Sequence, residues 1–193
     1  MLNKVYKTII YLTIHNNHFK AKLTISALSS NKETLLKAIN KKLFNGKLSK
    51  QEEMNFIIPT ENKTITGPIL NLKYLKLFSI KFYKCLKRLD KLVESKKGAG
   101  TAFIYSNLVR VGIDLFQEIL LQNGYLEFRE DQQYEIKPNT VDYKTGKTFE
   151  EFNKNNYSRK FIPSTFIRIT GKTDDDEELP DVKKKILDNY FNN

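Results

Sequence analysis

Two short segments contain residue types that bind phosphate in other proteins. Residues 145–148 and 170–173 both read TGKT, which includes the Gly-Lys-Thr that ends a P-loop. A P-loop needs another glycine five residues before the Gly-Lys pair, so that backbone amides can wrap the phosphates. Val141 and Phe166 occupy those two positions. We therefore exclude both segments as nucleotide-binding loops.

The residues that could hold a metal or act as nucleophiles are poorly placed for it. The acidic run 174–178 (DDDEE) lacks the spacing of a calcium loop, and we interpret it as capping a helix. His15 and His18 flank one turn, with no third ligand and no serine triad partner near them. Cys85 is the only cysteine, and we expect it to fill space in a helix. The residues themselves show no catalytic centre.

The best-defined pattern is a strand, a polar turn and a helix over residues 98–125 (GAGTAFIYSNLVRVGIDLFQEILLQNGY). Residues 101–105 are strand formers, Ser106 and Asn107 are turn formers, and apolar residues recur at helical spacing from Val109. Asn123-Gly124 ends the helix. In parallel sheets, ligands bind at the carboxyl end of such a strand. The pattern therefore places a candidate site at residues 105–107.

Charge is divided unevenly along the 193 residues, whose net charge is +11. Residues 1–100 carry a balance of +14 and residues 101–193 a balance of −3, and the basic first half favours phosphate-bearing partners. A Lys- and Asn-rich composition from an AT-rich genome would look the same, so charge alone leaves both interpretations open. We expect an intracellular protein, since no signal peptide and no apolar run of membrane-spanning length is present.

The remaining pattern predicts an α/β chain. Residues 4–14 and 18–25 predict a β-hairpin, and residues 31–44 a helix that stops at Asn45-Gly46. Residues 47–71 look irregular, and residues 72–93 predict one long helix with a lysine-rich outer face. Residues 126–128 and 165–170 predict strands, residues 149–152 a helical turn and residues 182–191 a closing helix. Residues 129–164 predict a partly mobile insertion.

Residues 97–125 closely resemble the motif IV region of superfamily 2 helicases from large cytoplasmic DNA viruses of the poxvirus, asfarvirus and mimivirus type. Further similar segments are 50–59 (KQEEMNFIIP), 77–82 (LFSIKF), 166–171 (FIRITG) and 186–193 (ILDNYFNN). The resemblance covers about residues 50–193. It implies the beginning of a second RecA-like domain over residues 68–193, an incomplete parallel sheet with helices. Residues 1–67 would precede it as a hairpin, a helix and a connecting segment.

A complete enzyme of that family also has a Walker A loop, a DExH box and motifs V and VI, and none of these occurs in this sequence. Those parts hold ATP and Mg²⁺ and stabilise the transition state. The resemblance therefore implies no cofactor in this chain alone, although a complete member uses ATP and magnesium. We expect the chain not to hydrolyse ATP by itself.

The resemblance also implies where nucleic acid would be contacted. It places Ser106, Asn107 and the helix amides near Val111 and Gly112 at the strand's carboxyl end, where the family tracks phosphates. A helix N-terminus is also an anion site on physical grounds. At the matching end of the neighbouring strand lie Thr170, Gly171 and Lys172. Ser106 and Asn107 could equally serve only to cap the helix, and the two roles are compatible.

The sequence thus predicts part of a viral ATP-dependent helicase that contributes contacts to DNA or RNA. The alternative is a stand-alone basic module that binds nucleic acid or a transcription complex, and a third possibility is a decayed gene product. Predicted partners are nucleic acid and either the missing ATPase half or a viral transcription complex, with no membrane. By resemblance, the expected location is the viral factory in host cytoplasm, or the virion.

Overall fold

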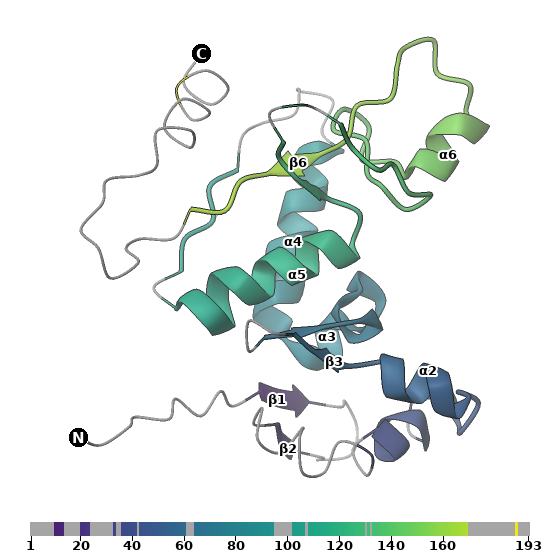
Figure 1. Ribbon diagram of the computed structural model, residues 1–193, viewed down its shortest axis with the longest axis vertical. Coiled ribbons are helices and arrows are strands. Elements are labelled where there is room, and N and C mark those ends of the chain that lie inside the picture. Colours follow the sequence, from purple (N-terminus) through teal and green to yellow (C-terminus); the bar gives the residue numbers. More distant parts are fainter. Residues whose placement is uncertain are drawn as a thin grey trace.

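A computed structural model describes residues 10–13, 20–23, 33, 36–41, 43–60, 64–94, 102–106, 108–129, 131, 133–169 and 188 (Figure 1). Within these ranges helices are combined with three two-stranded sheets, so the predicted α/β class is confirmed. The histidines, the acidic run and the predicted closing helix lie outside the described ranges, apart from Asp188, which is helical.

The N-terminal part follows the sequence pattern. Strand β1 (Ile10–Thr13) pairs antiparallel with β2 (Lys20–Leu23), with Ile10 opposite Leu23. This confirms the predicted antiparallel pairing for these residues, and the predicted turn lies outside the described residues. Residues 36–41 and 43–44 are helical. The helix ends at Asn45 and Gly46, whose φ angles of 52° and 75° are left-handed, and the predicted stop is also confirmed.

Residues 47–71 are more regular than their sequence suggests. Helix α2 (Lys50–Asn55) begins at Ser49, whose hydroxyl and the Glu52 carboxylate form a reciprocal capping box. Strands β3 (Ile58–Pro59) and β4 (Ile65–Thr66) then pair antiparallel, and a 3₁₀ turn, η1 (Pro68–Leu70), follows. The Ser-x-x-Glu spacing was the available signal for α2. The prediction of an irregular segment was wrong here.

The long helix predicted over residues 72–93 is two helices. Helix α3 (Leu72–Phe78) stops at Ser79, which is extended (φ −153°, ψ 114°), and α4 (Ile80–Val93) starts immediately after it. The Ser79 hydroxyl accepts a hydrogen bond from the Phe82 amide and thereby caps α4. The apolar periodicity continues across the break, so it could not reveal that the segment forms two separate helices.

The core is formed largely by helices from the middle of the chain. Leu75 of α3, Leu86 of α4 and Ile119 of α5 (Leu115–Gln122) are completely buried in one cluster. Phe82 of α4 stacks on Phe116 of α5, with ring centroids 5.8 Å apart. Figure 1 shows α5 lying across α4 above the β3–β4 pair. These helices provide the frame for the segments on either side.

The parallel sheet has two strands among the described residues. β5 (Leu126–Glu127) pairs in parallel with β6 (Thr165–Phe166), which confirms both predicted strands in part. The strand predicted at residues 101–105 is absent, because described residues 102–106 form no ladder. Phe103 is 86% exposed and Tyr105 77% exposed. A parallel strand needs both faces covered, and this segment lacks that cover.

Residues 133–164 are organised around one buried carboxylate. Asp142 is completely buried and pairs with Arg159, and it accepts hydrogen bonds from the backbone amides of Lys144, Thr145 and Ile162. Helix α6 (Phe149–Lys154) confirms the predicted helical turn and begins with a capping box between Thr148 and Glu151. Whether these residues are an insertion into a RecA-like domain stays a prediction.

Candidate nucleic-acid interface

Two of the predicted site residues are brought into direct contact. Gly112 is buried, and a Cβ atom built on it would lie 2.1 Å from the Ser106 hydroxyl oxygen. Only glycine therefore fits at residue 112 while Ser106 keeps its position. The family resemblance placed both residues at one end of a strand, and the structure brings them into contact, although described residues 102–106 form no strand.

The Ser106 side chain orders the turn into the helix. Its hydroxyl accepts a hydrogen bond from the Leu108 amide and donates one to the Leu108 carbonyl, both at 3.1 Å. Leu108 is the residue that precedes the helix, and its apolar side chain makes no capping hydrogen bond. Ser106 thus fixes the entry to the helix without capping its first turn, so the simple capping interpretation is wrong for this residue.

The helix begins in a wide conformation. Residues Val109–Asp114 form a π-helix, η2, in which the Ile113 amide bonds to the Leu108 carbonyl at 3.1 Å, and α5 continues from Leu115. Val111 and Gly112 lie in this turn. π-Helical turns are rare in proteins, and those that do occur often lie at functional sites. The apolar spacing predicted an α-helix from Val109, and that part of the prediction was wrong.

An ion pair joins η2 to the chain that leaves β6. Arg168 Nη1 lies 2.6 Å from Asp114 Oδ1, and both side chains are partly buried. The pair connects the helical turn that contains Val111 and Gly112 with the described chain just before the predicted segment 170–172. Asn107, Thr170, Gly171 and Lys172 lie outside the described residues, so their predicted role stays a prediction.

Large apolar side chains are exposed beside this turn. Phe103, Tyr105 and Leu108 are 86%, 77% and 55% exposed, whereas Ile104 between the two aromatics is half-buried against the core. The sequence analysis assigned the two aromatics to a core strand and missed them as surface residues. An apolar run of strand formers carries no signal for what covers it, so the sequence could not have revealed this.

The predicted basic outer face of the helices is exposed. It consists of side chains from α3 and α4 that point away from the core: Lys73, Lys76, Lys81, Lys84, Arg88 and Lys91. Lys87 differs because it is half-buried and lines a pocket. The exposed cations provide a surface that attracts phosphates, in agreement with the charge pattern of the sequence.

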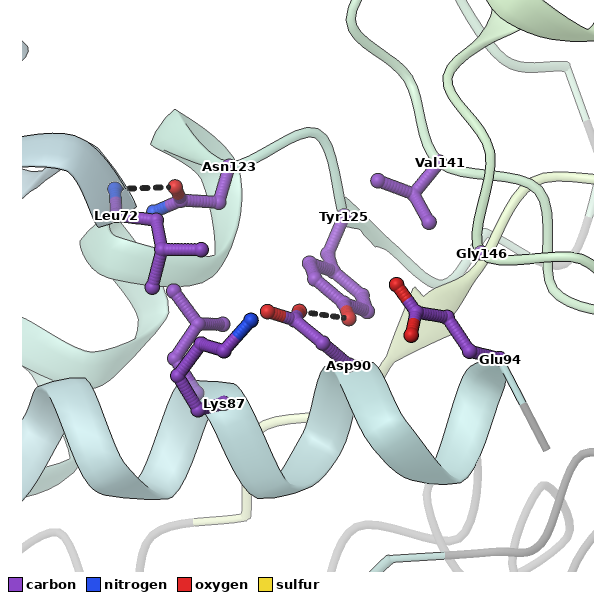
Figure 2. Close-up of a pocket in the computed structure, with 9 residues that line it drawn as sticks. Leu72, Lys87, Asp90, Glu94, Asn123, Tyr125, Val141 and Gly146 are labelled. Atoms are coloured by element: carbon purple, nitrogen blue, oxygen red, sulfur yellow. Dashed lines mark hydrogen bonds between the residues drawn. The ribbon is translucent and has the colours of Figure 1, made fainter.

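A pocket of about 210 Å³ lies between α4, the end of α5 and the turn at Gly146 (Figure 2). The Tyr125 hydroxyl lies 3.0 Å from Asp90 Oδ1 across it. Burial raises the pKa of Asp90, and burial together with the adjacent Asp90 charge raises the pKa of Tyr125. Asn123 closes one end by accepting a hydrogen bond from the Leu72 amide at 2.7 Å. The pocket's polar groups mainly hold the helices together.

The first TGKT segment has a structural role. The amides of Lys144 and Thr145 both donate to the buried carboxylate of Asp142, and Gly146 turns the chain with φ +67°. Amides that would wrap a phosphate in a P-loop are thus used for a side chain of this protein. The arrangement agrees with the exclusion of this segment as a nucleotide-binding loop.

Other classes of site find little support in the described ranges. They contain no cluster of three or more potential metal-ligating residues. Cys85 is half-buried, as expected, and burial raises the pKa of its thiol. None of the described helices combines the length and the apolar character needed to cross a membrane.

Comparison with known proteins connects the chain to a virus. It is 42% identical over 177 residues to a protein of Acanthamoeba polyphaga mimivirus named "Putative ATP-dependent RNA helicase". The match covers 85% of this chain and 15% of the mimivirus protein, so the chain spans a small part of its relative's length. No protein-family model matches the chain, and no solved structure matches it. The chain is therefore related to a viral protein that carries a helicase name.

Proposed function

We propose that this chain is a segment of a viral ATP-dependent nucleic-acid helicase and supplies contacts to the nucleic acid. The observation that carries the proposal is the 42% identity to the mimivirus protein, which extends over 85% of the chain. The site geometry supports it, because Ser106 and Gly112 order a turn that leads into a helix beside exposed aromatic residues. The fold implied is the beginning of a second RecA-like domain of superfamily 2, including motif IV.

In this proposal the phosphates are bound at the start of η2. The first amides of a helix have no acceptors within it, and Val111 and Gly112 belong to that first turn. Asn107 and the segment Thr170–Lys172 would contribute further contacts. The exposed lysines of α3 and α4 would attract the strand over a longer range.

ATP and Mg²⁺ would be bound by parts of the enzyme that this sequence does not contain. The chain has no Walker A glycine loop and no DExH box. An ATPase half or a viral transcription complex is therefore the expected protein partner, at a viral factory or in the virion. A basic module that binds nucleic acid without any ATPase is the second candidate, favoured by the exposed cations of α3 and α4.

The test is binding of fluorescein-labelled single-stranded DNA and RNA, measured by fluorescence anisotropy over a series of salt concentrations. Contacts to phosphates predict an affinity that falls steeply as salt rises. Ser106→Glu, which adds a negative charge to the turn, should weaken binding about tenfold or more. Asn153→Glu adds the same charge on the exposed surface of α6 and should change affinity less than about twofold.

Circular dichroism must show that both variants keep their helices. If the wild-type chain does not bind at low salt, it has no independent binding function. If Ser106→Glu and Asn153→Glu weaken binding equally, the η2 turn is not the contact point. ATP added with Mg²⁺ should leave the affinity unchanged, and a change would contradict the assignment of the nucleotide site to other parts of the enzyme.

A further inference from the structure

We infer that Phe103 and Tyr105 form a platform on which the unpaired bases of single-stranded nucleic acid stack. The inference deepens the proposed function and rests on it, because it adds base contacts to a site argued so far from phosphates. In the part of the chain that the structure describes, these two side chains are the most exposed of the large hydrophobic residues, at 86% and 77%. Exposing both rings to water is costly unless a ligand covers them.

The alternation of burial along residues 103–105 indicates that the two rings share one side of their segment. Ile104 between them is half-buried against the core, while its two neighbours are exposed. This alternation is that of extended chain, in which residues i and i+2 share a face about 6.6 Å apart. Two flat side chains so arranged can each contact a successive base of a strand.

The platform is held at its centre and at its C-terminal end. Ile104 packs on the core, and the Ser106 hydroxyl bonds to the Leu108 backbone just beyond Tyr105. Gly112 in turn fits tightly against the Ser106 side chain. Because the segment is fixed before a ligand arrives, little additional entropy is lost when a base stacks on it.

The charge of the molecule selects the partner. If another protein covered the two rings, apolar groups on its surface would be enough. This chain also has a net charge of +11 and exposed cations along α3 and α4, which favour a negatively charged partner. Aromatic rings combined with cations are the arrangement that binds single strands without sequence preference. Base pairs in a duplex hide their faces, so the platform selects unpaired strands.

The test uses the absence of tryptophan from the chain, which makes Phe103→Trp a single fluorescent reporter at the platform. The probes are thymidine and uridine oligonucleotides of about 12 nucleotides, and an abasic strand with the same length and phosphates. Stacking predicts quenching of the tryptophan by both base-containing strands and none by the abasic strand. The abasic strand should also bind wild-type protein at least about tenfold more weakly.

Alanine variants give a second measurement. Phe103→Ala and Tyr105→Ala should each weaken binding of the thymidine strand by about tenfold and leave binding of the abasic strand unchanged. Ile162→Ala removes a 46% exposed apolar side chain elsewhere and should not change either affinity.

The outcomes separate the platform from the proposed function. If abasic and base-containing strands bind equally well and the alanine variants bind like wild type, phosphate binding stands and the platform is wrong. If no strand binds, both are wrong. If Phe103→Ala changes the oligomeric state measured by light scattering without changing strand binding, the rings cover a protein contact and the platform is again wrong.

Discussion

Asp142 shows how a single carboxylate can organise a long segment. Its burial alone would raise its pKa, but hydrogen bonds from Arg159, from the Ile162 amide and from Thr145 outweigh burial and lower it. Arg159 also lies over the rings of Phe152 and Tyr157. A sequence pattern cannot reveal this role, since the acceptor and its cation are separated by 17 positions of polar chain.

We expect Asp142→Ala to reduce the free energy of unfolding by about 3 kcal/mol, because it removes one partner of a buried pair and leaves several donors unpaired. Urea denaturation measures the loss. Glu150→Gln is the matched control: it breaks the exposed pair with Lys154, in which both side chains are more than half exposed, and should cost less than about 0.5 kcal/mol. Equal losses in the two variants would contradict the role assigned to Asp142.

The carboxyls of Asp90 and Asp142 should have opposite effects on stability as pH changes. The pKa of Asp90 is raised in the folded protein, so the folded state binds its proton more tightly and gains stability as pH falls from neutral through that pKa. Asp142 has a lowered pKa, so its stabilisation is present above its unfolded value of about 3.9 and is lost as pH falls through the folded one.

Asp90→Asn should therefore abolish the gain in stability that protonation of Asp90 provides as pH falls. The difference in free energy of unfolding, wild type minus variant, is expected to rise as pH decreases from 7 to about 4. Tyr125→Phe removes a hydrogen bond that lowers the pKa of Asp90, so the gain should begin at a higher pH in that variant. Urea denaturation at several pH values measures both effects. A difference that does not change with pH would show that Asp90 titrates normally.

Predictions of single residues succeeded where geometry is local. Ser106 and Gly112 were expected together and are in contact, and Asn45-Gly46 ends a helix as expected. Phe103 and Tyr105 were misplaced, because strand propensity does not determine what covers a segment. Burial depends on the rest of the molecule.

At the scale of elements, helix starts that depend on a polar capping residue were not predicted. Ser49 and Ser79 each start a helix through a side-chain hydrogen bond, yet neither boundary was predicted. The apolar stripe continues through Ser79, so only the backbone reveals two helices. Elements with clear stop signals, such as the helix that ends at Asn123-Gly124, were predicted well.

The contact between η2 and the preceding turn can be tested by substituting Gly112 and Ser106. Gly112→Ala should destabilise the protein by about 1–3 kcal/mol, since the new methyl group overlaps Ser106. Ser106→Gly removes the overlapping atoms, so the double variant should recover much of that loss. A double-mutant cycle from urea denaturation measures the coupling. If the two effects simply add, the two residues are not in contact.

Asn123 joins elements that are far apart in the sequence. Its side chain accepts from the Leu72 amide and donates to the carbonyls of Leu70 and Ile119. Asn123→Ala should cost about 2–3 kcal/mol, because buried backbone groups lose their partners. Asn155→Ala removes a similar bond at the exposed end of α6 and should cost less than about 1 kcal/mol. Denaturation curves of both variants decide the point.

At the scale of the molecule, the α/β class and the basic surface were predicted and the arrangement was not. The described sheets have two strands each, and the buried cluster draws mainly on helices. Composition and periodicity indicate which elements exist, whereas their layering depends on contacts between distant residues. Similarity to the mimivirus protein supports the helicase relation independently of these details.

The purified chain is expected not to hydrolyse ATP with Mg²⁺, with or without nucleic acid, in an assay of phosphate release. Hydrolysis requires a glycine loop and magnesium-binding carboxylates that this sequence lacks. Lys147→Ala and Lys172→Ala are the controls, since they remove the lysines of the two TGKT segments. Hydrolysis that either variant abolishes would contradict the exclusion of these segments.

The pairing of β5 with β6 has a consequence for the protein while it is being made. All the partners of Asn123 precede it in the chain, so the helical core can close before the later segments leave the ribosome. The edge of β5 then stays unpaired until Thr165 of β6 has been synthesised, roughly 40 residues after Leu126. At roughly 5–20 residues per second, that delay is about 2–8 seconds. During this time an unpaired strand edge can recruit another nascent chain.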